Sequence, residues 1–309
     1  MSSVPTAIPA TGRHVRGSPA TSSSMPAAVM LQNPASCETR TVRLAATVAP
    51  ERIDVQSCTA AQLRERATLL RSGLCLPVGS VEYVRLAMQV AGISEPAFSC
   101  YPGRLATYMC ERPWRTTLGA ALASPKPVFI KPQRVKVFDG FVYNPTGFDL
   151  AASAEKWRLV RLDVPKAVQE DAAAYQEHLA GVNKLDPALA VWCAHPCTFA
   201  SEWRYYLQAG RVLGFARYDD GPDDAPEPND LDVTSIMADA PVDAICSLDV
   251  GVSADGGTWL IEVNDAWALG YYRGDSTLTP RAYLGMLWAR WQQLVASSGV
   301  PGSCGASQR

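Results

Sequence analysis

Three residues on two neighbouring segments near the C-terminal end could together hold a divalent cation. Asp249 precedes a glycine-containing turn, and Glu262 and Asn264 follow it at alternate positions. Alternate residues of a β-strand lie on one face, so a hairpin would bring the three side chains together. Two carboxylates and an amide supply the oxygen ligands that Mg²⁺ prefers, and Mg²⁺ also holds phosphates. The pattern predicts a magnesium site, with a solvated sheet face carrying incidental acids as the alternative.

The register of this hairpin decides whether the acids meet. With residues 255–256 at the centre of the turn, Asp249 is expected to pair with Glu262 and Gly251 with Leu260. Opposed like charges destabilise a strand pair, and a divalent cation removes that penalty. The apolar residues of the second strand that are expected to enter the core are Trp259, Ile261 and Val263.

Basic residues that could bind a polyphosphate occur upstream of this hairpin. Arg204 shares a strand face with Glu202, and Arg217 ends the partner strand of the same predicted hairpin. Lys131 ends a short apolar strand, and Lys136 lies in the loop that follows it. Arginine offers bidentate contacts and lysine a point charge to phosphate oxygens. Cations beside three metal ligands predict a polyphosphate site; taken alone, each could be an ordinary surface charge.

The elements that must position these residues fall into two parts. Residues 40–123 show an α/β pattern, and Ser80 is a good N-cap for one of its helices. The elements expected there are a strand at 42–48 and helices at 60–71, 81–91 and 105–122.

Residues 124–298 change to a pattern of short strands. The elements expected there are strands at 128–132, 138–143 and 157–162, a helix at 171–181, hairpins at 202–218 and 244–264, and a closing helix at 280–296. Residues 1–37 contain no Asp or Glu and are rich in Ser, Pro, Ala and Thr, which predicts a disordered tail over 1–39. A start at a later methionine and a transit peptide are the alternatives. Residues 299–309 are expected to form a second loose tail.

Composition limits the classes of function. The chain has 309 residues, of which 48% are hydrophobic, enough for two or three units with real cores. The 28 Lys and Arg nearly cancel the 30 Asp and Glu, so no overall positive field would hold nucleic acid or an anionic membrane. No stretch approaches the ~20 apolar residues needed to span a bilayer. Nine cysteines without a disulfide-like spacing indicate reduced thiols and a cytoplasmic location.

Several of these segments resemble the ATP-grasp superfamily. Residues 261–264 match its E-x-N signature, and Asp249 precedes Glu262 at a separation typical of the D-alanine–D-alanine ligase branch. Residues 129–132 resemble the strand whose lysine binds ATP phosphates. The resemblance implies an α+β fold in which two α+β subdomains with antiparallel sheets grip ATP, after a small N-terminal α/β pre-ATP-grasp region.

A closer resemblance is to the ATP-grasp clade named for two arginines and a lysine, over residues 40–295. The segments that carry it are 79–84, 101–102, 131–140, 202–204 and 264–272. It implies that Lys131, Arg204 and Arg217 give the clade its name. The loop at 133–140 departs from the ligase branch because it lacks that branch's several glycines.

The resemblance also implies a role for each candidate residue, with Glu202 at the ribose and residues 192–199 as the hinge along adenine. The expected ATP-binding residues are Lys131, Lys136, Trp192 and Glu202. The expected Mg²⁺ ligands are Asp249, Glu262 and Asn264. The expected catalytic residues are Lys131, Arg204 and Arg217, with the arginines on phosphate or on an acyl phosphate.

The implied activity is that of an ATP- and Mg²⁺-dependent ligase. ATP phosphorylates a carboxylate, and an amine attacks the acyl phosphate to form an amide or peptide-like bond. The implied substrates are a small-molecule or peptide carboxylate and an amine. Two alternatives stay open: a nucleotide-binding regulatory or assembly module without ligase activity, and a phosphotransferase acting on a small hydroxyl substrate.

Overall fold

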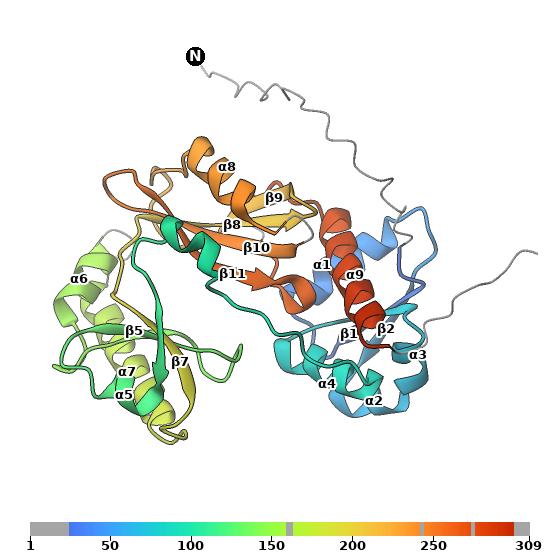
Figure 1. Ribbon diagram of the computed structural model, residues 1–309, viewed down its shortest axis with the longest axis horizontal. Coiled ribbons are helices and arrows are strands. Elements are labelled where there is room, and N and C mark those ends of the chain that lie inside the picture. The colour runs from blue at the N-terminus through green and yellow to red at the C-terminus, as the bar shows by residue number, and fades with distance from the viewer. Residues whose placement is uncertain (1–24, 159–162, 242–243, 273–275, 300–309) are drawn as a thin grey trace, which may run out of the picture.

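The computed structural model describes residues 25–158, 163–241, 244–272 and 276–299. Within these residues the chain forms three sheets, each with helices of its own (Figure 1). Two sheets are four-stranded and antiparallel, and one is three-stranded and parallel. The expected α+β architecture with an α/β N-terminal region is therefore confirmed. No helix in the described ranges is long and apolar enough to cross a membrane.

The N-terminal unit is built on the parallel sheet, in which β1 lies between β2 and β3. Its strands are β1 (Ala28–Gln32), β2 (Asp54–Cys58) and β3 (Cys75–Val78). Its helices are α1 (Cys37–Thr47), α2 (Ala60–Glu65), α3 (Ala67–Arg71) and α4 (Val81–Ala91). Parallel strands need crossover connections, which these helices supply. Ser80 caps α4 as predicted, because its side chain accepts a hydrogen bond from the Tyr83 N–H.

The predicted limit of the N-terminal tail is wrong. Strand β1 lies inside the 1–39 range and is the central strand of its sheet. Val29 and Met30 are fully buried, as a strand covered on both faces requires. Residues 1–24, the rest of that predicted tail, lie outside the described residues.

The strand predicted at 42–48 is a helix. Ser36 and Thr39 form a capping box that starts α1, and Val42 and Ala45 face the core. These apolar residues are three apart, so the weak alternation of the sequence reflects one helical face.

The second unit is the antiparallel sheet with strand order β4–β7–β5–β6. Its strands are β4 (Trp114–Thr117), β5 (Val128–Pro132), β6 (Phe141–Tyr143) and β7 (Ala190–Ala194). Its helices are α5 (Leu118–Leu122), α6 (Leu150–Arg158) and α7 (Val164–Val182). Figure 1 shows this unit beside the other antiparallel sheet.

Two expectations for this part of the chain need correction. The stretch 105–122 is not one helical region: it contains the end of a 3₁₀ turn, η1 (Gly103–Tyr108), then β4 and α5. Because β4 and α5 belong to this unit, the predicted boundary at 123/124 cuts through it. The strand predicted at 157–162 begins within the last turn of α6, and residues 159–162 lie outside the described ranges.

The third unit is the antiparallel sheet with strand order β11–β10–β8–β9. Its strands are β8 (Ser201–Gln208), β9 (Arg211–Arg217), β10 (Ile245–Val252) and β11 (Thr258–Asp265). Two short helices accompany it, α8 (Asp230–Asp239) and the 3₁₀ turn η2 (Ala266–Ala268). Both predicted hairpins are confirmed.

A β-bulge in the β10–β11 hairpin sets the position of the acids. Asp249 pairs with Glu262 as predicted, but Gly251 pairs with Trp259 and not with Leu260. Next to the loop, the two strands therefore pair one residue away from the predicted register. The bulge at Ile261 brings the strands back to the predicted register at Asp249 and Glu262.

The bulge also changes which side chains enter the core. Leu260 and Val263 are buried, whereas Trp259 and Ile261 are only half-buried. Of the three residues expected in the core, only Val263 is there. An extra residue in one strand reverses the alternation on either side of it, so a regular pattern could not predict this outcome.

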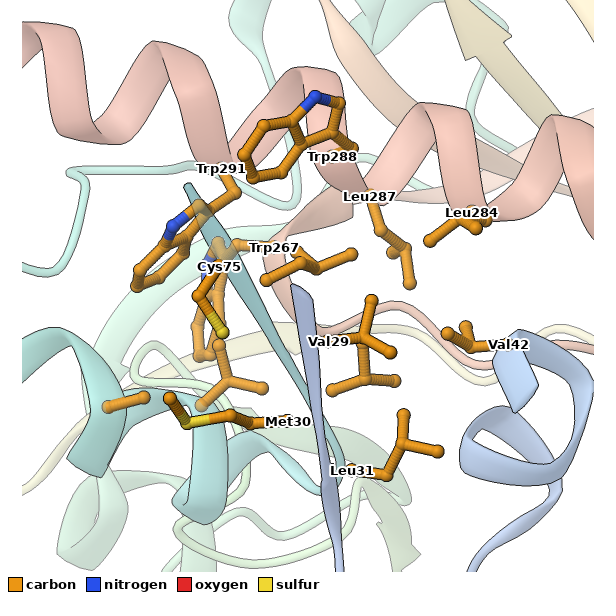
Figure 2. Packing of buried hydrophobic residues seen from close by; sticks show 14 of the residues in the cluster. Val29, Met30, Leu31, Val42, Cys75, Trp267, Leu284, Leu287, Trp288 and Trp291 are labelled. Atoms are coloured by element: carbon orange, nitrogen blue, oxygen red, sulfur yellow. The ribbon is translucent and has the colours of Figure 1, made fainter. Parts of the chain in front are cut away.

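The C-terminal helix α9 (Pro280–Ser297) packs onto the N-terminal unit. Figure 2 shows Leu287, Trp288 and Trp291 of this helix facing Val29 and neighbouring residues of the parallel sheet. The closing helix is confirmed, but it completes the core of the first unit. The helix also contacts the third unit, where the Tyr283 ring lies 6.5 Å from that of Tyr206.

Trp291 is 1% exposed and is central to this shared core. Replacing Trp291 with Ala should lower the free energy of unfolding by roughly 3–5 kcal/mol, since it removes apolar contacts and leaves a cavity. Urea denaturation followed by circular dichroism measures this loss. Leu231→Ala, at a side chain that is 76% exposed, is the control and should change the stability by less than about 0.5 kcal/mol. Equal losses in the two variants would contradict the assigned core.

Candidate active site

A cleft of about 1030 Å³ opens where the three units meet. Its walls come from β5 and the loop after it, from β8, β10 and β11, and from the segments that begin α1 and α4. The predicted site residues that line it are Lys131, Lys136, Glu202, Arg204, Asp249, Glu262 and Asn264. Trp192 and Arg217 are not among the residues of its wall.

Arg204 and Asp249 form a bidentate ion pair at the base of the cleft. They lie opposite each other on β8 and β10. The Nε–Oδ1 distance is 2.7 Å and the Nη2–Oδ2 distance is 2.6 Å. The two side chains are only 9% and 3% exposed. Burial disfavours the charge on Arg204, but the attraction of Asp249 outweighs it and raises the pKa of the guanidinium.

A second ion pair crosses the cleft. Lys131 Nζ, at the end of β5, hydrogen-bonds Glu262 Oε2 on β11. The side chains are 17% and 16% exposed. Because β5 and β11 belong to different sheets, this pair joins the two antiparallel units at the point where the predicted phosphate and metal residues meet.

Asn264 links the two acids. Its Nδ2 donates to Asp249 Oδ2 at 3.1 Å and to Glu262 Oε1 at 3.0 Å. Both carboxylates therefore lie within reach of one amide group, and turning that amide over would present its oxygen to the same point. This donor set of two carboxylates and one amide fits Mg²⁺. Arg204 contacts Asp249 and Lys131 contacts Glu262 at the same place.

Two stacked tyrosine rings lie against the guanidinium of Arg204. The Tyr218 and Tyr272 rings stack with centroids 5.0 Å apart, and Arg204 Cζ lies 5.7 and 4.9 Å from their centroids. Tyr218 also hydrogen-bonds Glu202, whose carboxyl pKa is raised chiefly by burial. Tyr218 is not among the predicted site residues; it lies one residue beyond the end of β9, where strand alternation no longer indicates a side chain's direction.

Trp192 lies next to the cleft but is not part of its wall. It pairs with Lys131 across β7 and β5, so the two side chains share a face of the sheet, and Trp192 is 9% exposed. Its ring meets Tyr101 edge to face at 5.2 Å, and Arg115 Cζ lies 4.5 Å from its centroid. The expected position of Trp192 along adenine stays a prediction.

The rest of the predicted hinge does line the cleft. The residues that do so are Ala194, His195, Pro196, Cys197 and Phe199. Phe199 lies over Gly251 of β10, where a Cβ would stand 2.5 Å from its ring. Gly251 therefore allows the hinge to approach the third sheet closely.

Arg217 organises the turn after β9. Its Nε and Nη2 bond the two carboxylate oxygens of Asp219 at 2.8 and 2.6 Å, and its Nη1 donates to the Pro222 carbonyl at 2.8 Å. Asp219 also accepts the Glu202 N–H at 2.8 Å. Arg217 pairs with Trp203, on the sheet face opposite to Arg204. Asp219 thus connects Arg217 to Glu202, which lines the cleft.

The loop at 133–140 is held to the N-terminal unit. Arg85 Nη2 donates to the Val135 carbonyl at 3.0 Å, and Glu95 binds Arg85 through both carboxylate oxygens at 2.8 and 2.9 Å. Lys136 has a φ of 61°, in the left-handed region, and its Nζ lies 2.7 Å from Asp139 Oδ1. Such a backbone conformation costs a non-glycine residue about 1–2 kcal/mol, so the contacts of the loop must hold it.

Two antiparallel sheets that face each other across this cleft, with acids and cations meeting between them, define the ATP-grasp class. A family model for the ATP-grasp domain, family 3 of the clade named for two arginines and a lysine, matches residues 87–294, more than half of the chain. The chain therefore belongs to this family. The predicted family and the predicted ATP-grasp fold are both confirmed.

Solved structures with a similar arrangement include several ATP-grasp ligases. D-alanine–D-alanine ligase from Bacillus anthracis, complexed with ATP, is 12% identical with a TM-score of 0.45, over 89% of this chain and 100% of that one. The ATP-grasp ligase PsnB complexed with minimal precursor is 13% identical with a TM-score of 0.46, over 86% and 99%. A RimK domain ATP-grasp protein from Sphaerobacter thermophilus is 15% identical with a TM-score of 0.46, over 85% and 98%. No curated protein matches the chain.

The Arg204–Asp249 pair can be tested with a double-mutant cycle. Arg204→Met should lower the free energy of unfolding by roughly 3–5 kcal/mol, because it leaves a buried carboxylate without its main partner. Arg204→Met combined with Asp249→Leu should lose less than Arg204→Met alone, since no charge is then left unpaired. Denaturation with guanidinium chloride measures the free energy of unfolding of the wild type, the two single variants and the double variant. Strictly additive losses would show that the two side chains do not interact.

Proposed function

We propose that this protein is an ATP- and Mg²⁺-dependent ligase that forms an amide or peptide-like bond through an acyl phosphate. The observation that supports this proposal most strongly is the meeting of one buried ion pair, one half-buried ion pair and one amide at a single cleft. Lys131 and Arg204 supply the cations, and Asp249, Glu262 and Asn264 supply the oxygens. Each group is of a type that a metal-bound triphosphate requires.

Asp249, Glu262 and Asn264 would hold Mg²⁺, which when bound would offset negative charge on the phosphoryl group. Lys131 and Arg204, which now contact these acids, would then turn their N–H groups to phosphate or acyl-phosphate oxygens. Both cations are shielded from water, so each contact is stronger than it would be on the surface.

The remaining residues would position the nucleotide and the two substrates. Glu202 would accept a hydrogen bond from a ribose hydroxyl, and residues 194–199 would lie along adenine. Beyond the phosphate site the cleft continues to Ser36 and Ser80, which gives the carboxylate and amine substrates room. Holding both close to the phosphoryl group would let each attack in turn, without a covalent enzyme intermediate.

A nucleotide-binding module without turnover is the second candidate. The observation that favours it is that each acid already has a cation partner, Arg204 for Asp249 and Lys131 for Glu262. A protein that only binds nucleotide could use these two cations for phosphate without any transfer chemistry.

Turnover separates the two candidates. With Mg²⁺, ATP and a panel of amino acids and peptides, the wild-type protein should release ADP. Glu262→Gln should abolish that release while the circular dichroism spectrum stays unchanged, because the substitution removes a metal-binding charge. Asp255→Asn, at the exposed tip of the same hairpin, is the control and should retain full activity.

Three results would argue against the ligase. ATP binding without ADP release across the panel would support the binding module. A stable phosphorylated product with no amide would indicate a phosphotransferase. Near-wild-type turnover by Glu262→Gln would exclude the assigned metal site.

A further inference from the structure

The second unit, from β4 to β7, joins the rest of the chain through two backbone connections. Residues 109–113 lead from η1 into β4, and residues 195–200 lead from β7 to β8 (Figure 1). Both connections contribute residues to the cleft wall. Any motion of this unit relative to the third sheet must therefore bend both of them.

The register of the sheet brings one cysteine from each connection together. Strands β4 and β7 are antiparallel, with Trp114 opposite Cys193. Continuing that register outward places Cys110 opposite Cys197. The two connections do stay together beyond the last ladder pair, because the rings of Trp114 and His195 lie 5.3 Å apart.

The two thiols are near each other. Cys110 is close enough to raise the pKa of the Cys197 thiol, and both line the cleft as free thiols. Cys110 is exposed and Cys197 is half-buried. Opposed residues of antiparallel strands have Cβ atoms about 4.5–5.5 Å apart, and a disulfide needs about 3.5–4.5 Å. A small approach of the two connections is enough to form the bond.

We propose that Cys110 and Cys197 are a reversible redox site: a peroxide oxidises them to a disulfide that fixes the cleft in its closed arrangement. The structure shows that arrangement, because Lys131 of the second unit contacts Glu262 of the third sheet across the cleft. A covalent bond between the two connections would hold the units at this separation.

The chemistry balances with hydrogen peroxide as the oxidant. The exposed Cys110 attacks first: its sulfur bonds to one peroxide oxygen, the O–O bond breaks, and the product is a sulfenic acid plus water. Cys197 then attacks the Cys110 sulfur, the S–O bond breaks, and the leaving hydroxide takes the thiol proton as a second water. Two thiols and one peroxide thus give one disulfide and two waters, and a dithiol reverses the reaction.

The order of the two steps follows from the surroundings of each sulfur. Burial, the hydrogen bond to Cys110 and the nearby Glu111 raise the pKa of the Cys197 thiol to about 12. Cys197 is therefore mostly protonated at neutral pH and reacts slowly with peroxide, whereas its attack on the oxidised Cys110 is favoured by the closeness of the two residues.

The cross-link is tested on the full chain. After treatment with hydrogen peroxide, free thiols are blocked with N-ethylmaleimide, and the protein is digested without reduction for mass spectrometry. The expected product is a linked peptide pair containing Cys110 and Cys197, which dithiothreitol separates. Cys110→Ser and Cys197→Ser should each lose it, while the control Cys37→Ser should retain it. Recovery of both cysteines as separate blocked or over-oxidised peptides would overturn the proposal.

The closed arrangement has a readout of its own. In the oxidised protein the rate of ADP association should fall by at least about threefold, and dithiothreitol or Cys110→Ser should restore it, because a locked cleft admits ligand slowly. A confirmed disulfide with an unchanged association rate would refute the locking effect. The association experiment rests on the proposed nucleotide site, whereas the cross-linking experiment does not. Failure of the nucleotide site can therefore be told apart from failure of the redox site.

Discussion

The meeting of two opposite-charge pairs in one cleft, one buried and one half-buried, is the constraint on which the rest of the structure depends. A buried charge without a partner costs several kcal/mol, so the chain must bring Arg204 to Asp249 and Lys131 to Glu262. The first pair lies within the third sheet, and the second requires two sheets to face each other. The Tyr218 and Tyr272 rings complete the shielding of Arg204 from water. The same groups that satisfy each other here are those that a magnesium-bound triphosphate would use.

Local signals in the sequence were enough to place much of this site. The β10–β11 hairpin, the pairing of Asp249 with Glu262 and the cation at the end of β5 are all readable from strand alternation and turn residues. The N-cap at Ser80 is equally local. The predicted pairing of Asp249 with Glu262 is correct, although the predicted register next to the loop is not. The loop shifts the register by one residue and the bulge at Ile261 shifts it back, so the two irregularities cancel at the acids.

What the sequence could not supply depends on distant contacts. Strand β1 lies in a segment without a single acid, and only its burial between β2 and β3 makes it the centre of a sheet. Trp192 is an aromatic residue of a type that can stack on adenine, yet it packs against Tyr101 and Arg115 and does not line the cleft. Arg217 has the charge for phosphate, yet Asp219 in the following turn binds its Nε and Nη2. The partners of Trp192 lie on other elements and Asp219 lies beyond the end of β9, so strand periodicity encodes neither choice.

Calorimetric titration with ATP and Mg²⁺ tests the central claim most directly, because it measures whether the cations of this cleft hold a triphosphate. The account predicts that Lys131→Ala weakens ATP binding by about tenfold or more, as expected for losing a charge-assisted contact of roughly 1.5–3 kcal/mol. Lys184→Ala, at an exposed lysine of the same unit, should bind as the wild type does. An unchanged ATP affinity in Lys131→Ala would contradict the account.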